Sequence, residues 1–371
     1  MTTTTELLKT PIYNWHSSNG GRMVDFAGWS MPVQYGSIID EHNGTRNGVG
    51  LFDVSHMGRF LFTNTAAIDF LEGLTTRRVA GMEPGKIRYS LMMNDTGGIQ
   101  DDVLVYHLQR LDGTPFVYMV VNASNREKIK GWLNQKGDLD SLGFHDRTTE
   151  TAMIAVQGPQ ALEAVAQFVQ PAPADLKYYH GTAVEIMGEE CLMSRTGYTG
   201  EDGCELIVSA AIAEAVWEKL VELAAARGGG AVGLAARDTL RLEAAMPLYG
   251  HELAEDINPV QADIGFAINL KDREFVGRSE ILRAKKDDQL SRRVGFELEG
   301  KRAAREDSEV FVDGQSIGKI TSGTFSPTLQ KPVAMGFVQP EFKAEGTQVE
   351  IDIRGKRTSA KIVKLPFYQR S

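Results

Sequence analysis

Short runs of hydrophobic residues, bounded by glycine-rich or polar turns, recur along the chain and predict more strands than helices. Strands are expected at residues 86–93, 99–106, 115–121, 152–156 and 294–298. Hydrophobic residues at helical spacing predict helices at residues 37–47, 66–74, 210–227 and 233–243. Hairpins are interspersed among strand–helix alternations, so the pattern indicates an α+β protein with a mixed sheet rather than a doubly wound one.

Local signals mark the ends of some of these elements. The sequence Asn94-Asp-Thr-Gly-Gly98, between two strands, is typical of a short hairpin loop. Ser124 and Glu127 have the spacing of a capping box, which predicts that a helix begins beside them. From residue 292 onward, strands and turns follow one another without strong helices. This C-terminal pattern predicts a small β-barrel or sandwich as a separate domain.

Two adjacent carboxylates, Asp101 and Asp102, lie in the second strand of the predicted hairpin. Successive side chains of a strand point to opposite faces, so Asp101 shares a face with Val103 and Asp102 shares the other with Leu104. Both faces are otherwise apolar, which indicates a strand buried on both sides. Because a buried carboxylate needs a hydrogen bond or a charge partner, the pair either closes a structural polar network or serves a ligand.

The composition limits the classes of function. With 371 residues, two or three domains are expected, and 42% hydrophobic with 24% charged residues is ordinary for a soluble protein. The net charge of −9 argues against a general nucleic-acid surface. Cys191 and Cys204 are too few for a disulfide framework, no apolar run approaches a membrane span, and the chain start does not resemble a signal peptide. We therefore expect a cytoplasmic protein that binds neither membranes nor nucleic acid.

Sequences that resemble metal-binding or nucleotide-binding motifs are incomplete or lie in the wrong structural context. The glycines of residues 228–233 match G-x-G-x-x-G but follow a predicted helix instead of a strand. The sequence that begins at His251 lacks the second histidine of a zincin motif, and neither a G-x-S-x-G elbow nor a P-loop occurs. The sequence thus predicts no metal site and does not support serine-nucleophile or nucleotide-phosphate chemistry.

A glycine-rich turn between strands holds Tyr198 and Glu205. An aromatic ring and a carboxylate at such a turn suit a planar heterocycle, because the ring can stack and the carboxylate can accept from N–H groups. The alternative is an ordinary hairpin turn whose Glu205 pairs with a surface base. The residues alone leave both interpretations open.

Arg237 and Arg241 lie one turn apart on a predicted helix. They either present a cationic pair to a carboxylate or form ion pairs with Asp238 and Glu243, and exposed pairs of the second kind are common. Asn122 ends a predicted strand and is free to contact a ligand.

Eight segments, taken together and in order, closely resemble aminomethyltransferase, the T-protein of the glycine cleavage system. They are residues 21–26, 52–57, 97–102, 121–125, 154–159, 196–200, 233–243 and 321–328. The resemblance spans about residues 10–368. It implies a three-lobed, cloverleaf-like α+β fold. Residues 1–285 would form the folate-binding region, as two intertwined subdomains (1–50 with 140–285, and 51–139), and residues 286–371 would form a C-terminal β-barrel.

The resemblance also implies an activity. The aminomethyl group on the lipoyl arm of the H-protein would be converted to ammonia and 5,10-methylenetetrahydrofolate, without a metal and by a monomer. Asp101 is then the catalytic carboxylate beside the folate nitrogens, and Asp102 is its structural partner. The implied folate-binding residues are Met57, Tyr89, Asn122, Tyr198, Glu205, Arg237 and, from the C-terminal tail, Arg370 or Tyr368.

One position departs from the motif, since Cys204 stands where an aromatic residue is usual. Two other functions remain as alternatives: a folate-dependent demethylase of a sulfonium or methylamine substrate, and a folate-binding accessory protein without turnover. Whether Asp101 acts as a base or by its charge is also left open. Its neighbours Ile99 and Val103 should raise its basicity by desolvation, and this does not decide between the two roles.

Overall fold

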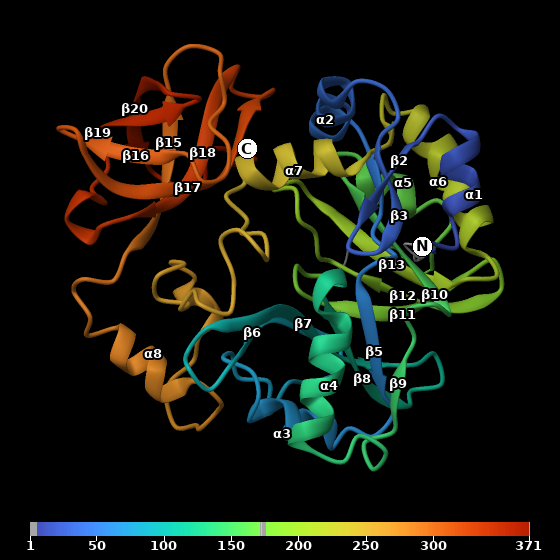
Figure 1. The fold of residues 1–371 in the computed structure, drawn as a ribbon. Helices are drawn as coiled ribbons and strands as arrows, with labels where there is room; N and C mark the ends of the chain where they lie inside the picture. Colours follow the sequence, from blue (N-terminus) through green and yellow to red (C-terminus); the bar gives the residue numbers. More distant parts are fainter. Residues whose placement is uncertain (1–5, 171, 173–175, 371) are drawn as a thin grey trace, which may run out of the picture.

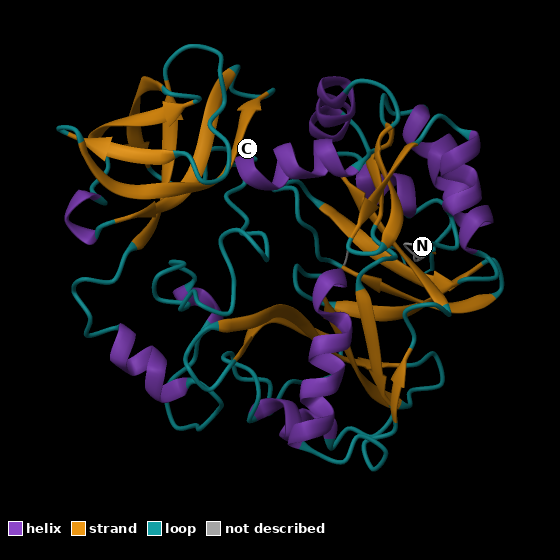
Figure 2. Ribbon diagram, viewed as in Figure 1, coloured by secondary structure: helices purple, strands orange, loops and turns teal. Residues whose placement is uncertain are grey.

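The computed structural model describes residues 6–170, 172 and 176–370, and the chain forms three lobes around a common centre (Figure 1). Residues 1–5, part of the start that showed no signal peptide, lie outside the described residues. Strands and helices are both plentiful (Figure 2), which confirms the predicted α+β class.

The first lobe is built on a six-stranded sheet. Its strands in spatial order are β11 (Gly181–Ile186), β12 (Glu189–Ser194), β13 (Gly203–Ser209), β10 (Thr151–Gln157), β4 (Gly50–Asp53) and β14 (Gly230–Ala231). A three-stranded sheet lies beside it, with β1 (Leu8–Lys9), β3 (Trp29–Gln34) and β2 (Arg22–Phe26). The helices of this lobe are α1 (Tyr13–Ser18), α2 (Ile38–Asn47), α5 (Ala161–Val165) and α6 (Ala213–Ala225). Trp217 of α6 is fully buried in the core that these elements share.

The second lobe contains the predicted hairpin. Its five strands in order are β6 (Lys86–Met93), β7 (Ile99–Gln109), β8 (Pro115–Val121), β5 (Gly58–Phe62) and β9 (Phe144–Asp146). Two helices, α3 (Ala67–Glu72) and α4 (Arg126–Lys136), pack on one face of this sheet (Figure 1). Asn94 shapes the hairpin turn, because its Oδ1 accepts hydrogen bonds from the backbone of Thr96 and Gly98 at 3.1 and 2.8 Å.

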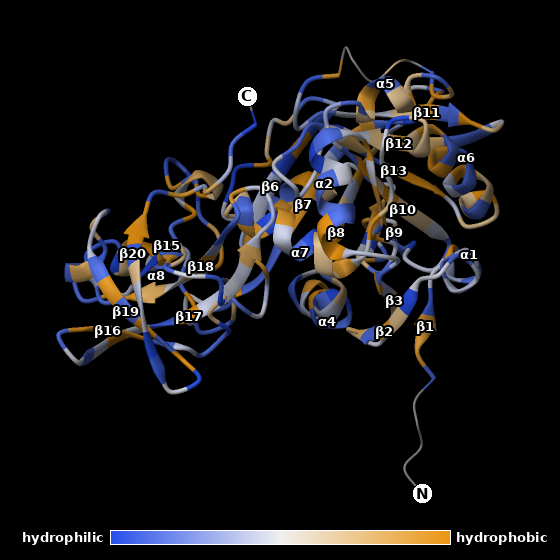
Figure 3. Cartoon of the chain, turned by 90° about the horizontal axis from the view of Figure 1, so that it is seen from above, coloured by the Kyte–Doolittle hydropathy of each residue, from blue (hydrophilic) through white to orange (hydrophobic). Residues whose placement is uncertain are grey.

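The predicted capping box was wrong. A short 3₁₀ turn, η1 (Ala123–Asn125), precedes α4, and no side chain caps that helix. Ser124 instead lines the central cavity. The apolar residues gather on the central strands, whereas the outer helices α2 and α4 are largely hydrophilic (Figure 3).

The third lobe is the predicted C-terminal barrel, and it is closed. Its strands in order are β15 (Arg292–Leu298), β18 (Lys331–Val338), β17 (Gln315–Ser326), β16 (Glu309–Val312), β19 (Gln348–Ile353) and β20 (Lys356–Val363). The 3₁₀ turn η4 (Pro340–Phe342) joins two of them. Before the barrel, a segment with η3 (Gly265–Ala267) and α8 (Arg278–Ala284) packs against the hairpin end of the second lobe.

Helix α7 (Leu234–Glu243) runs from the first lobe to the barrel (Figure 1). Its last residue, Glu243, is fully buried and joins the two lobes. It accepts from Arg46 of α2 at 2.8 Å, and from Ser326 and Thr328 of the barrel at 2.5 and 2.8 Å. The buried ion pair thus fixes the position of α7, which carries Arg237 and Arg241.

Candidate active site

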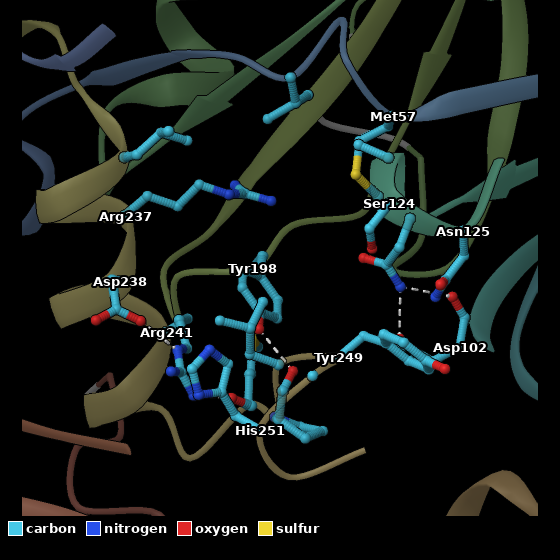
Figure 4. A pocket seen from close by; sticks show the side chains of 18 of the residues that line it. Met57, Asp102, Ser124, Asn125, Tyr198, Arg237, Asp238, Arg241, Tyr249 and His251 are labelled. Atoms are coloured by element: carbon cyan, nitrogen blue, oxygen red, sulfur yellow. Dashed lines mark hydrogen bonds and ion pairs between the residues drawn. The ribbon is translucent and has the colours of Figure 1, made fainter. Parts of the chain in front are cut away.

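A cavity of about 930 Å³ lies where the three lobes meet. Its walls come from the loop between β4 and β5, from β7 and η1, from residues 196–198, from α7, from residues 246–251 and from β17 of the barrel. Figure 4 shows Asp102 and Met57 on one side and Arg237, Asp238 and Arg241 of α7 on the other. Segments far apart in the sequence therefore converge on one site.

Of the two adjacent carboxylates in β7, Asp102 is the one that lines this cavity. Asn122 donates from Nδ2 to Asp102 Oδ1 at 2.7 Å, and the Tyr89 hydroxyl donates to Oδ2 at 3.2 Å. These two hydrogen bonds leave part of the carboxylate facing the cavity. Asn122 and Tyr89 both line the cavity themselves, as expected for binding residues.

Asp101, predicted as the catalytic group, is fully buried behind the wall and does not line the cavity. It accepts from the backbone and side chain of Asn122 at 3.0 and 2.8 Å, and from Asn125 at 2.7 Å. Its strand neighbours Val103 and Val105 belong to the core beneath α3 and α4. In the structure, Asp101 thus lies behind the wall as a partner of Asn122 and Asn125, whereas Asp102 faces the cavity.

Burial raises the pKa of both carboxyl groups, and the charge of Asp102 raises the pKa of Asp101 further. Hydrogen bonds from Asn122 act in the opposite direction on each. A carboxylate with a raised pKa is a stronger base than an exposed aspartate. The pair thus combines a fixed geometry with increased basicity at the cavity wall.

Glu205 also faces the cavity and is buried. Its carboxylate accepts a short hydrogen bond from the Thr196 hydroxyl. Burial raises its pKa, while that hydrogen bond and the charge of Arg237 act against the rise. The surface ion pair considered from the sequence is therefore wrong, because Glu205 lies inside the protein with acceptor capacity left for a ligand.

Arg237 and Arg241 behave differently although they share a helix face. Arg241 donates to Asp238 at 2.8 Å, to Glu252 at 3.0 Å and to Ser322 of the barrel at 2.8 Å. The guanidinium of Arg237 has no hydrogen bond or ion pair within the described residues, and its Nη1 is buried. It lies over the ring of Tyr198, with 4.8 Å between the guanidinium carbon and the ring centre. Arg241 is structural, and Arg237 is available to a ligand.

Of the remaining expected residues, Met57 and Tyr198 line the cavity, whereas the C-terminal tail does not. Arg370 lies 3.4 Å from Asp202 in an ion pair, and the ring of Tyr368 stacks beneath Arg46. The tail packs on the outside of the junction between α2 and α7, so the expectation that Arg370 or Tyr368 lines the pocket is not met.

Two cavity residues were not among those that the sequence analysis predicted to bind a ligand. Phe266 is 64% exposed and stacks on Tyr89 with ring centres 5.7 Å apart. It belongs to the irregular segment before α8, where neither helical nor strand periodicity occurs. His56 lines the cavity from the loop between β4 and β5, and only its place beside Met57 in the segment 52–57 pointed to it.

Three further features concern the described part of the chain. It contains no cluster of three or more histidine, cysteine, aspartate or glutamate side chains able to hold a metal ion. Its helices are all too short or too polar to span a membrane. Cys191 and Cys204 are both buried free thiols.

Fold and site together define a three-lobed α+β protein with a central cavity that carries polar groups on facing walls. Residues 12–272 match the family described as the GCVT N-terminal domain, and residues 292–369 match the glycine cleavage T-protein C-terminal barrel domain. The chain is 41% identical over 368 residues to an aminomethyltransferase of Halalkalibacterium halodurans, with 99% of each protein covered. It is also 41% identical over 374 residues to one of Symbiobacterium thermophilum, with 98% of each covered.

A solved structure agrees with these matches. The crystal structure of the glycine cleavage system aminomethyltransferase T from Bartonella henselae superposes with a TM-score of 0.88 at 32% identity, covering 98% of both chains. The chain belongs to the aminomethyltransferase family, the T-proteins of the glycine cleavage system.

Proposed function

We propose that the protein transfers the aminomethyl carbon from the lipoyl arm of the H-protein to tetrahydrofolate, with release of ammonia. The observation that supports this most strongly is the set of polar groups in the cavity of an aminomethyltransferase fold that retain hydrogen-bonding capacity for a ligand. Glu205 offers acceptor capacity, Arg237 offers unpaired donors, and Asp102 presents a carboxylate. Buried groups of this kind are unfavourable without a ligand, so the chain retains them at a stability cost.

The donor and acceptor groups fit the pterin ring of tetrahydrofolate. Glu205 suits the amine and ring N–H edge, and the nearby Arg237 suits a carbonyl oxygen beside that edge. Tyr89 and Tyr198 supply flat apolar surfaces for the ring system. Met57 and Asn122 complete the walls near Asp102. Tetrahydrofolate, when bound, supplies the nucleophilic nitrogen that takes over the carbon.

Asp102 is the group that we propose acts in the chemistry. Asn122 and Tyr89 hold its carboxylate in one orientation, which reduces the entropy cost of alignment with the reacting atoms. Its raised pKa makes it a stronger base toward a proton of a ligand nitrogen than an exposed aspartate would be. Before it takes the proton, its negative charge also favours a positively charged carbon. Asp101 keeps Asn122 in place from behind and contacts no ligand.

The remaining expectations about the whole protein are part of the same proposal. Residues 1–285, as subdomains 1–50 with 140–285 and 51–139, would bind the folate. The barrel of residues 286–371 would complete the cavity through Thr321, Ser322 and Gly323. We propose a cytoplasmic monomer whose macromolecular partner is the lipoylated H-protein.

Reconstitution tests the proposal. Purified protein is mixed with aminomethylated H-protein, with and without tetrahydrofolate, and ammonia is measured over time. Folate-dependent ammonia release is expected. Methylated folate formed from a sulfonium or methylamine donor would identify a demethylase instead, and folate binding with neither activity would identify an accessory protein.

A further inference from the structure

His56 stands in the loop that crosses from the first lobe to the second and is held rigidly there. On its N-terminal side, the backbone nitrogen of Ser55 donates to Asp53 Oδ1 at 2.9 Å. The buried guanidinium of Arg59 donates through Nη1 to the carbonyl oxygens of Ser55 and Met57, at 2.9 and 2.7 Å, on both sides of it. The backbone position of His56 is therefore fixed, and its side chain lines the cavity.

The imidazole has no hydrogen bond within the described residues, although only 4% of His56 is exposed. Its Nδ1 is a buried polar atom without a partner, and the imidazole makes a T-shaped contact with the ring of Phe26, with centres 5.4 Å apart. A buried nitrogen left unpaired destabilises the folded state, whereas an apolar ring of similar shape in its place is close to neutral. Nothing in the packing of the protein alone explains a histidine at this position.

The protonation state of the His56 imidazole limits the kind of ligand group that it can bind. Burial lowers the pKa of His56 to about 4, and the charges of Arg237 and Arg59 lower it while that of Asp53 raises it. The imidazole is therefore neutral at pH 7 and offers one donor and one acceptor. Arg237 also has a buried unpaired nitrogen, and its guanidinium carbon lies 5.9 Å from the ring centre of Phe52. Phe52 belongs to β4, which leads directly into the loop that carries His56, so the two unpaired groups line neighbouring parts of the cavity.

We propose that His56 is a further folate-binding residue, which forms a hydrogen bond with the polar edge of the pterin ring on the same side as Arg237. The proposal rests on the proposed function. A neutral imidazole suits an uncharged ring, because it gains a hydrogen bond without adding a second cation beside Arg237. The protein retains an unpaired nitrogen in the free state and gains the hydrogen bond only when the ligand is bound.

The test measures two quantities for each variant: its affinity for 5-methyltetrahydrofolate and its stability to unfolding. This folate is chosen because it cannot accept the transferred carbon. His56→Phe removes both nitrogens but keeps a ring, and we expect about tenfold weaker binding by calorimetry with an unfolding midpoint no lower than wild type. His56→Gln keeps a neutral donor and acceptor, so its affinity should stay within about threefold of wild type. His107→Phe is the matched control: His107 Nε2 is also buried and unpaired but lies outside the cavity, and its Nδ1 bonds to Met82 O at 2.6 Å. It should lower the midpoint and leave folate affinity unchanged.

Other outcomes overturn the proposal. Wild-type affinity in His56→Phe, or failure of that variant to fold, would show that the imidazole serves packing or chemistry and not folate binding. A lower kcat with unchanged folate affinity would assign His56 to the transferred group. Absence of folate binding by the wild-type protein would overturn the proposed function itself, and this result is separate from any effect of the variants.

Discussion

Replacement of Asp102 by asparagine separates the function of this carboxylate from its effect on stability. The substitution keeps the size of the side chain and one acceptor oxygen, but it removes the charge that faces the cavity. Asp101→Asn is the matched control, because it makes the same change one residue earlier and outside the cavity. We expect Asp102→Asn to lower kcat by about 10²–10⁴-fold and to change folate affinity only a few-fold.

The structure also gives the sign of the stability effect. The side-chain nitrogen of Asn122 lies 2.8 Å from an oxygen of Asp101 and 2.7 Å from an oxygen of Asp102, so these oxygens are at most 5.5 Å apart. Two negative charges at that separation repel by about 3 kcal/mol at an effective dielectric constant of about 20. Loss of a hydrogen bond at residue 102 offsets about 1 kcal/mol of this relief. Asp102→Asn should therefore be more stable than wild type by about 1–2 kcal/mol at pH 8.

The pH dependence follows from the raised pKa values of the pair. In the unfolded chain both carboxyl groups ionise near pH 4, whereas in the folded protein burial delays ionisation. The penalty is absent below pH 4 and grows as the pH rises through the folded pKa values, so the advantage of Asp102→Asn should disappear near pH 4. In Asp101→Asn, one of the two oxygens that accept hydrogen bonds from Asn122 and Asn125 is replaced by an amide nitrogen. This variant should therefore be destabilised by about 1.5–3 kcal/mol.

Urea unfolding at pH 4, 6 and 8, together with ammonia-release kinetics, measures both effects. Asp101→Asn should keep more than about a tenth of wild-type turnover, since its side chain is behind the wall. A folded but inactive Asp101→Asn variant, together with substantial turnover in Asp102→Asn, would contradict a catalytic role of Asp102. That result would restore the assignment suggested by the sequence motif.

Two other predictions address the ring-binding edge and the junction between lobes. Glu205→Gln places a donor where an acceptor is needed, so folate affinity measured by calorimetry should fall about 10–100-fold with a smaller change in kcat; unchanged affinity would remove Glu205 from the binding site. Although burial favours the protonated form of Glu243, hydrogen bonds from His42 and Ser326 and the charge of Arg46 lower its pKa to about 2. The stability that Glu243 contributes is present above about pH 4.5 and is lost as the pH falls toward 2. Glu243→Gln should cost about 3 kcal/mol at pH 7 in urea unfolding and should flatten this acid dependence; an unchanged acid profile would contradict the assignment.

Much of the fold followed from local pattern, because hydrophobic period and turn chemistry act within a few residues. The strand at 115–121 and the helix α7 lie where the period placed them, and the barrel begins where helical periodicity ends. Contacts between lobes were beyond this kind of reasoning. The ion pairs of Arg241 with Asp238 and Glu252 distinguish it from Arg237, and only the tertiary structure brings residue 252 to α7.

The sequence alone could not tell whether Asp101 or Asp102 faces the cavity, and the reason lies in the hairpin. The sequence showed that the two side chains face opposite ways, but both faces are apolar and neither could be identified as the cavity wall. The position of Tyr89 on the neighbouring strand indicates which face is the cavity wall, but only if the register between the two strands is known. Met93 pairs with Ile99 near the turn, and an uninterrupted register would place Tyr89 opposite Val103, on the face of Asp101.

A β-bulge between Met92 and Met93 shifts the register by one residue, so that Tyr89 pairs with Leu104 on the face of Asp102. Because the side-chain period of a strand is two, this single residue exchanges the carboxylate that shares a face with the tyrosine. The short turn and the motif around it carry no clear signal for the bulge. The hydrogen bond from Tyr89 to Asp102 is therefore a consequence of the bulge.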